Sequence, residues 1–269
     1  MNPTLPSLFV PHGAPTFALA PGAAGAALKA QAGALPRPRA VVIVSAHWLT
    51  GTAVVGTADR LETIHDFYGF PDALYTIRYP ASGCREGAEL VAQAITAAGL
   101  TVQQDRQRGL DHGAWVPLRL MYPDADVPVI PLSLPHHATP ADAWRLGLAL
   151  APLTEQGFLV VGSGSLTHNL RDFQNAFHGG SGSFDYVRNF ADWFASHLAA
   201  GDVEALLDYR RRAPEAARAH PSEEHLLPLF VALGAGGAAA HAERFHSGID
   251  DYVIAMDAYA FRPSTGEIQ

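Results

Sequence analysis

Short, continuous runs of valine, isoleucine and leucine recur along this chain, and each run is followed by a turn or a helical segment. Apolar residues at nearly every position, rather than at alternate positions, are typical of strands buried on both faces, as in a parallel sheet. Strands are therefore predicted at residues 7–10, 40–45, 53–57, 127–134 and 158–162. The segment 252–261 is predicted as a last strand that adds antiparallel at an edge of the sheet.

Helical periodicity appears between these strands. Thr139 and Asp202 stand where N-caps belong, and Gly33, Gly99 and Gly201 stand where C-caps belong. The predicted helices cover 23–32, 86–98, 140–151, 186–199, 203–212 and 222–233. Strands that alternate with helices predict an α/β fold with a central mixed, mainly parallel sheet and helices on both faces.

The length of 269 residues suits one large α/β domain or two small ones. Because no internal repeat, charge run or long linker divides the chain, a single domain spanning residues 1–269 is predicted. The net charge of -8 argues against a nucleic-acid partner. No apolar stretch approaches the roughly 20 residues that span a bilayer, so a cytoplasmic protein without a membrane partner is expected. A homo-oligomer is compatible with this sequence.

The positions of the histidines point to chemistry. His12, His47 and His168 each follow or end a predicted strand. Ligands of open α/β sheets bind outside the carboxyl ends of the strands, so these three imidazoles can meet in one crevice. Cys84 is the only cysteine, so a metal site would rely mainly on nitrogen and oxygen ligands. Gly13 and Gly164 would let the backbone approach a ligand closely.

Three further segments carry candidate residues. The segment 220–225 is predicted to open a helix with Ser222 as its N-cap, and His225 there is either a metal ligand or a packed histidine. At 109–115 a turn leads into a helix, with Asp111 as its cap and His112 facing a pocket. The aromatic loop 64–71 is either a surface loop held by its own side chains or a lid over an aromatic substrate. The candidate substrate-binding residues of this loop are His65, Phe67 and Tyr68.

Six motifs, in order, resemble those of a known family. They are LFVPHG at 8–13, VIVSAHW at 42–48, IHDFYGFP at 64–71, LDHGAW at 110–115, LTHNL at 166–170 and EHLLPL at 224–229. In these motifs the chain resembles the DODA-type branch of the class III extradiol ring-cleavage dioxygenases, which includes the 4,5-DOPA dioxygenases and is related to the catalytic subunit of protocatechuate 4,5-dioxygenase. The resemblance covers residues 6–261.

The resemblance implies roles for individual residues. His12, His47 and His225 match the metal ligands, although the neighbouring Glu224 keeps a carboxylate ligand open as an alternative. Since successive helical residues point about 100° apart, only one of Glu224 and His225 is expected to face the metal. His168 matches a histidine that acts as acid and base in the wider superfamily and lies near or on the metal in this branch. His112 matches a pocket histidine that contacts substrate or oxygen.

The implied reaction is cleavage of a catechol ring by O₂ next to the diol, giving a muconic semialdehyde. Fe(II) is the expected metal, and Zn(II) can occupy such a site in purified protein. Two other interpretations stay open. Three histidines with an open position also suit a zinc hydrolase, in which the metal activates water. The third interpretation is a non-catalytic metal-binding protein, whose metal would be enclosed by protein ligands and indifferent to catechols.

Overall fold

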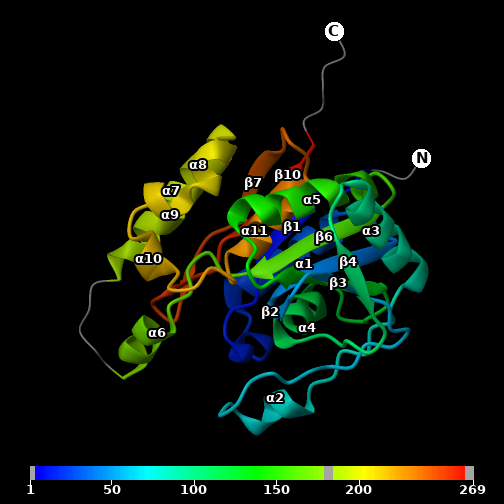
Figure 1. Ribbon diagram of the computed structural model, residues 1–269. Helices are drawn as coiled ribbons and strands as arrows, with labels where there is room; N and C mark the ends of the chain where they lie inside the picture. Colours follow the sequence, from blue (N-terminus) through cyan, green and yellow to red (C-terminus); the bar gives the residue numbers. More distant parts are fainter. Residues whose placement is uncertain (1–3, 179–183, 264–269) are drawn as a thin grey trace.

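The computed structural model describes residues 4–178 and 184–263, and an eight-stranded sheet forms its centre (Figure 1). The strand order is β4-β3-β5-β2-β6-β1-β10-β7. The strands are β1 (Ser7–Pro11), β2 (Ala40–Thr50), β3 (Ala53–Gly56), β4 (Val102–Asp105), β5 (Val129–Pro135), β6 (Phe158–Gly164), β7 (His241–His246) and β10 (Ala258–Arg262). A separate two-stranded ribbon joins β8 (Ile249–Asp250) to β9 (Ile254–Ala255).

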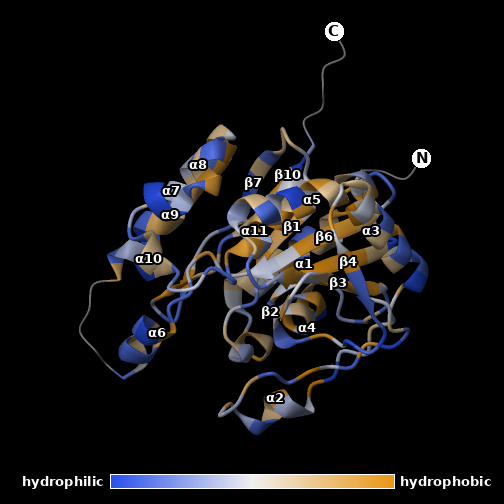
Figure 2. Cartoon of the chain, viewed as in Figure 1, coloured by the Kyte–Doolittle hydropathy of each residue, from blue (hydrophilic) through white to orange (hydrophobic). Residues whose placement is uncertain are grey.

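The sheet is mixed and mainly parallel, as predicted. β2 pairs in parallel with β5 and β6, β1 with β6, and β3 with β4. The antiparallel pairs are β1 with β10, β10 with β7, and β3 with β5. The central strands β1, β2, β5 and β6 are almost wholly buried, and Figure 2 shows them as the apolar centre of the molecule. Their continuous apolar sequence therefore reflects burial on both faces.

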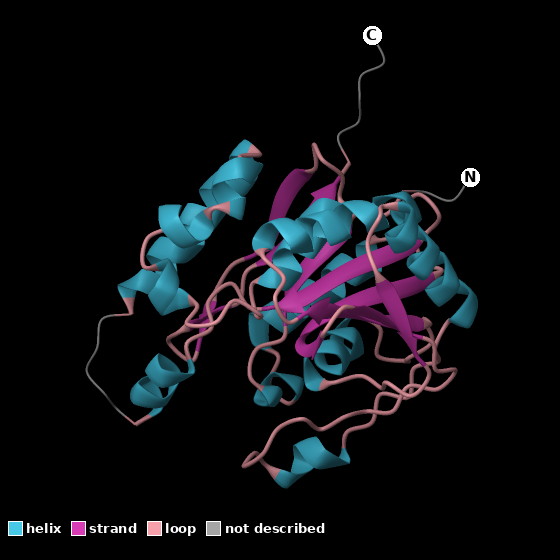
Figure 3. Ribbon diagram, viewed as in Figure 1, coloured by secondary structure: helices cyan, strands magenta, loops and turns pink. Residues whose placement is uncertain are grey.

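Helices cover both faces of the sheet, again as predicted (Figure 3). On one face lie α3 (Arg85–Ala97), α5 (Pro140–Thr154) and α11 (Leu227–Ala235), and on the other lie α1 (Gly22–Ala34) and α4 (His112–Met121). A group of helices with α7 at its centre packs beside β7 and β9. Its members are α6 (Leu170–Phe177), α7 (Asp185–Ala200), α8 (Val203–Leu207), α9 (Tyr209–Arg212) and α10 (Ala216–Ala219). Two short pieces, η1 (Pro15–Ala18) and α2 (Asp72–Thr76), complete the order of elements.

Most predicted helix ends are confirmed by their capping contacts. Thr139 caps α5 in a reciprocal box with Asp142, and Asp202 caps α8 through the backbone N–H of Ala205. Gly201 ends α7 in the left-handed region, with φ of 66°. Gly33 is the exception, because α1 continues through it to Ala34.

The predicted helix at 222–233 is wrong at its start. α11 begins only at Leu227, and residues 222–226 form turns. Pro228 in the first turn explains the late start, because a ring without an N–H fits the first turn of a helix and not its interior. Ser222 is therefore not an N-cap, and its hydroxyl donates to a carboxylate oxygen of Glu224.

Other strand and helix boundaries also differ from the prediction, which lacks the edge strands β4 and β7. The last strand, β10, covers only Ala258–Arg262 and is not at the edge, because β7 pairs outside it. Polar residues hide β7 (HAERFH) and β4 (VQQD) from an apolar pattern search, since edge strands need little burial. β2 runs on to Thr50, and the predicted helix at 203–212 divides at Asp208. Among the described residues, no helix is long and apolar enough to cross a membrane.

Candidate metal centre

Three adjacent strands place three histidines at one end of the sheet. β2, β6 and β1 are neighbours, and His12 and His168 follow β1 and β6 at their carboxyl ends. His47 lies within β2 rather than after it, where the register with β5 shifts between Val44 and Leu49. That irregularity turns the segment out of regular pairing and lets the imidazole reach the carboxyl ends of the neighbouring strands. The crossover connections of the sheet therefore bring together histidines that are far apart in the sequence.

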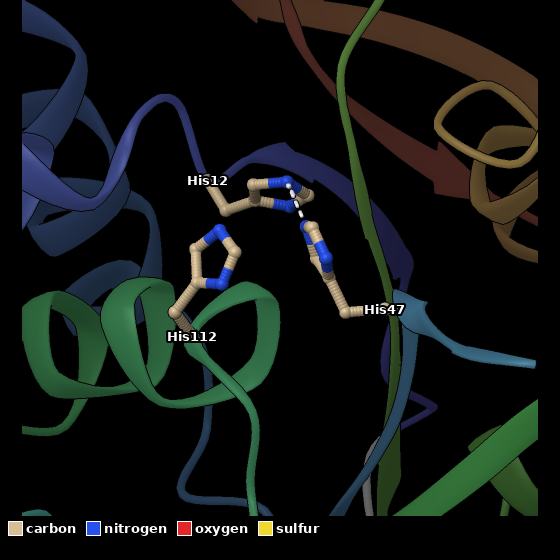
Figure 4. A group of neighbouring side chains, drawn as sticks. All are labelled: His12, His47 and His112. Carbon is tan, nitrogen blue, oxygen red and sulfur yellow. Dashed lines mark hydrogen bonds between the residues drawn. The ribbon is translucent and has the colours of Figure 1, made fainter. Parts of the chain in front are cut away.

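Two more histidines reach the same place from outside these strands. His112 is the first residue of α4, whose cap Asp111 accepts from the backbone N–H of Ala114. His225 lies in the turn ahead of α11. Figure 4 shows His12, His47 and His112 turned toward one another, from the loop after β1, from β2 and from the start of α4. The rings of His12 and His225 are also close, with centroids 5.3 Å apart.

The Nε2 atoms of His12, His47 and His225 converge. Nε2 of His47 lies 3.2 Å from Nε2 of His12 and 3.3 Å from Nε2 of His225. His12 and His225 are only 2% and 5% exposed. The rings of His12 and His225 are therefore buried, and water has little access to their nitrogen atoms from behind the rings.

The opposite nitrogen of each ring faces an oxygen acceptor. Nδ1 of His12 lies 3.1 Å from Oγ of Ser163, whose own proton is donated to the carbonyl of Gly113. Nδ1 of His225 lies 2.9 Å from Oε1 of Glu224, and Nδ1 of His47 lies 3.6 Å from Oδ2 of Asp66. Since a carboxylate only accepts, and the Ser163 proton is already donated, the contacts of His225 and His12 assign a proton to Nδ1 and a lone pair to Nε2. Asp66 lies beyond hydrogen-bond distance from His47, but its negative charge favours the same tautomer there.

This arrangement fits a divalent metal ion. Three lone pairs that face one another at short distance repel unless a cation lies between them. Two imidazole–metal bonds of about 2.1 Å can hold their nitrogen atoms at most about 4.2 Å apart, and the distances of 3.2 and 3.3 Å fall within that span. Oxygen partners behind each ring are the usual supports of metal-binding histidines.

Burial also keeps these imidazoles in the form that binds a metal. Desolvation lowers the pKa of His12 and of His225 well below the usual value, and neighbouring histidines lower both further. Desolvation lowers the pKa of His47 to about 4. Neutral imidazole is the metal-binding form, so all three ligand positions are available at pH 7 without loss of a proton.

Two glycines in β6 allow the turn with His225 to lie against the sheet. A Cβ at Gly164 would stand 2.1 Å from the carbonyl oxygen of His225, and one at Gly162 would stand 2.0 Å from that of Pro228. The backbone N–H of Ser165 donates to the same His225 carbonyl at 2.8 Å. The close approach at Gly164 is thus to the backbone that carries His225, and not to a ligand as the sequence had led us to expect.

We expect Gly164→Ala to weaken metal binding by about tenfold or more and to destabilise the fold by about 1–3 kcal/mol. The added methyl group would push the His225 backbone off β6. Chelator competition would measure the metal affinity, and thermal unfolding the stability. Gly51→Ala is the matched control, because a Cβ at Gly51 meets no atom within 4 Å. Equal metal affinity in both variants would contradict this account of His225.

A cavity of about 320 Å³ opens beside the converging nitrogens. Its wall includes His12, His47, His112, His168 and His225, together with Glu224 and apolar side chains. The ring of His168 stacks on that of His225 at 3.5 Å between centroids with 5° between planes. Burial lowers the pKa of His168, so its imidazole is neutral at pH 7. The neutral imidazole of His168 is therefore a proton acceptor beside the cavity in which a ligand would bind.

Glu224 and His225 both line this cavity, and the expectation that only one of them faces the metal stays a prediction. Both line it because they lie in the turn at 222–226, where the helical spacing of about 100° does not hold. The carboxylate of Glu224 contacts Nδ1 of His225, on the side away from Nε2. Glu224 therefore supports the imidazole from behind in this geometry.

Asp66 is a site residue to which the sequence assigned no role. Its Oδ1 accepts from the backbone N–H of His112 at 2.9 Å and lies 3.0 Å from Nδ1 of the same residue. Its Oδ2 lies 3.6 Å from Nδ1 of His47. Burial opposes ionisation, but the hydrogen bonds and charge of His112 lower the pKa of Asp66 to about 2. The sign of this role in the sequence is that Asp66 follows a histidine in an aromatic loop.

Asp66→Asn should reduce metal affinity by roughly 10- to 100-fold, the usual cost of losing such a support. The amide keeps the size of the side chain but not its negative charge, so both imidazoles lose their anionic partner. Chelator competition on the purified variant would measure the affinity. Asp59→Asn is a suitable control, because Asp59 is an exposed carboxylate that pairs with Arg85. Unchanged affinity in Asp66→Asn would remove this role.

The loop 64–71 brings one of its three candidate residues to the cavity. Phe67 is 5% exposed and lines the wall, as does Phe70. His65 lies behind Phe67, where its Nε2 is 3.1 Å from the carbonyl oxygen of Ile77. Tyr68 is 90% exposed and is not part of the cavity wall.

Comparison with known proteins shows the family to which this chain belongs. The profile of the catalytic LigB subunit of aromatic ring-opening dioxygenase matches residues 24–261. The 4,5-DOPA dioxygenase extradiol of Beta vulgaris is 40% identical over 226 residues, which cover 84% of this chain and 83% of that protein. The 4,5-DOPA dioxygenase extradiol of Escherichia coli (strain K12) is 36% identical over 234 residues, covering 86% and 85%.

A solved structure confirms the fold. A crystal structure of a protein from Escherichia coli K12 superposes with a TM-score of 0.79 at 30% identity, over 95% of this chain and 99% of that one. The family profile, the relatives and the fold thus agree over most of the chain. The chain belongs to the LigB family of aromatic ring-opening dioxygenases and is a metal-binding dioxygenase of the extradiol type.

Proposed function

We propose that this chain opens the ring of a catechol next to its diol with O₂, yielding a muconic semialdehyde. The proposal has one mononuclear site with His12, His47 and His225 as ligands and Fe(II) as the active metal. The supporting observation is the set of three Nε2 lone pairs at 3.2 and 3.3 Å, each backed by an oxygen on Nδ1. The relatives named 4,5-DOPA dioxygenase extradiol support a catechol as substrate.

Fe(II) held there would supply the redox chemistry between the diol and O₂, and Zn(II) would fill the same ligands without it. The remaining work belongs to side chains. Phe67 offers its ring to the aromatic substrate in the apolar part of the cavity. Tyr68 and His65 do not reach the wall, so their part in substrate binding is through the loop that carries Phe67.

His168 is the proposed acid and base. Its neutral imidazole lines the cavity next to His225 and can take a proton from a catechol hydroxyl and later return it to an oxygen of the opening ring. His112 is the proposed hydrogen-bonding partner of the reacting oxygen atoms. Because its Nδ1 faces Asp66, its Nε2 remains for the cavity, where it accepts in the neutral form and donates in the protonated form.

We also propose that residues 1–269 act as one catalytic domain. The match to the family over 24–261 and one hydrophobic core that includes β1, β6, α7 and β10 support this.

Anaerobic loading with Fe(II) or Zn(II), followed by O₂, tests the function. We expect the Fe(II) protein to consume O₂ with a catechol and form a yellow product, and the Zn(II) protein to do neither. Hydrolysis of ester or amide substrates by the Zn(II) protein, with no O₂ uptake by the Fe(II) protein, would instead identify a zinc hydrolase.

A further inference from the structure

We infer that the cavity selects catechols whose ring substituent carries no net negative charge, and that catechols with an anionic ring substituent are excluded. This inference rests on the proposed function and names the substrate class of that same site. It follows from which side chains line the cavity away from the histidines, and from what their polar atoms already bind.

The wall away from the histidines is apolar. Its side chains are Pro15, Phe67, Phe70, Leu170, Phe173 and Ile254. They come from η1, the loop 64–71, α6 and β9. Such a wall gains free energy from apolar groups and offers no hydrogen bond to a charged one.

The two neutral polar residues of the wall are already engaged. Oγ of Ser165 donates to the carbonyl of Thr167 at 2.7 Å. Nδ2 of Asn169 donates to the carbonyl of Arg218 at 2.7 Å, and its Oδ1 accepts from the backbone N–H of Asp172 at 3.0 Å. The hydroxyl of Ser165 therefore has no proton left for a carboxylate, and one of the two N–H groups of the Asn169 amide is already used.

The charges of the wall also disfavour an anionic substituent. Among the described residues, no lysine or arginine lines the cavity, whereas the carboxylate of Glu224 does. The stretches outside the described residues, 1–3, 179–183 and 264–269, contain no lysine or arginine in their sequence. Arg171 follows Leu170 in α6, but successive helical side chains point about 100° apart, and Arg171 is exposed and not part of the wall.

An anionic substituent would therefore lose hydration, meet no lysine or arginine and approach the carboxylate of Glu224. Repulsion from Glu224 acts only on the anion, and the loss of hydration costs an ion far more than a neutral group of the same shape. An aminoalkyl group that carries both an ammonium and a carboxylate has no net charge, and its ammonium can approach Glu224. Substituted catechols should thus rank by charge rather than by size.

The test compares 3,4-dihydroxybenzoate with 3,4-dihydroxybenzamide, which have the same shape and differ in charge. Calorimetry on the Zn(II)-loaded protein measures binding without turnover, and O₂ uptake by the Fe(II) protein measures kcat/KM. We expect the amide to exceed the acid by on the order of 10²-fold in both, with 4-ethylcatechol at least equal to the amide. Equal binding of acid and amide would overturn the inference. Selective binding without O₂ uptake would leave it standing and reject the proposed function instead.

A substitution at the exposed Leu170 tests whether the missing cation is the cause of this selectivity. Leu170 is 60% exposed, so Leu170→Lys can place a cation at the wall without disturbing the core. We expect the ratio of 3,4-dihydroxybenzoate affinity to amide affinity to be about tenfold higher in Leu170→Lys than in Leu170→Gln and Leu170→Met, its neutral controls. If the lysine does not raise this ratio above that of the controls, the missing cation is not the cause and the inference fails.

Discussion

His12→Ala is expected to yield a folded protein that holds no metal after anaerobic loading and consumes no O₂ with any catechol. The imidazole of His12 is buried, and its Nε2 lies 3.2 Å from that of His47. Its removal leaves two ligands and an unfilled space, and two imidazoles hold Fe(II) poorly. Metal content by mass spectrometry and O₂ uptake measure both losses, and circular dichroism reports the fold.

His241→Ala is the control, because His241 is exposed on β7. It should keep one metal per chain and full activity. A His12→Ala protein with a full complement of metal would show that His12 is not a ligand, and would leave His112 beside His47 as the nearest replacement, with ring centroids 4.1 Å apart.

His168→Ala is expected to keep its metal and bind catechol, while turnover falls by roughly 10²-fold or more, the usual contribution of a positioned proton transfer. His168 stacks face to face on His225, and ligand atoms of His168, Glu224 and His225 lie within 4.8 Å of one another, so the metal content of the variant decides between base and ligand. His168→Phe is the sharper variant, since a phenyl ring keeps the stacking and removes only the proton-transfer group. Metal content and anaerobic catechol binding accompany the rate measurement.

Two results would contradict this role. If His168→Ala and His168→Phe are as free of metal as His12→Ala, then His168 is a ligand and His112 becomes the next candidate for the base. If His168→Phe turns over at the normal rate, then no proton passes through this side chain.

The sheet could be predicted because its central strands are buried on both faces. Val41, Val42, Ile43 and Val44 of β2 are at most 1% exposed, which explains their unbroken apolar sequence. The edge strands β4 and β7 could not be predicted, because an edge strand satisfies its backbone while its side chains stay polar. The burial of its side chains, rather than their β-propensity, therefore decides whether a strand can be predicted.

The candidate site also has one part that the sequence predicts and one part that depends on contacts in the folded chain. His12, His47 and His168 stand next to predicted strands, so topology alone brings them to one end of the sheet. The supports behind the rings depend on long-range contacts: Ser163 behind His12 is 151 residues away in the sequence, and no local pattern encodes such a distance. The orientation of His225 depends on glycines in β6 that contact it only in the folded chain.

The reaction of the Fe(II)-loaded protein with a neutral catechol under ¹⁸O₂ tests the central claim most directly. Mass spectrometry of the product, quenched and reduced at once to prevent exchange of the aldehyde oxygen with water, locates the label. Extradiol cleavage predicts a ring-opened semialdehyde that carries both atoms of one O₂, one in the new carboxylate and one in the aldehyde. A product without label, or an intact ring, would contradict it.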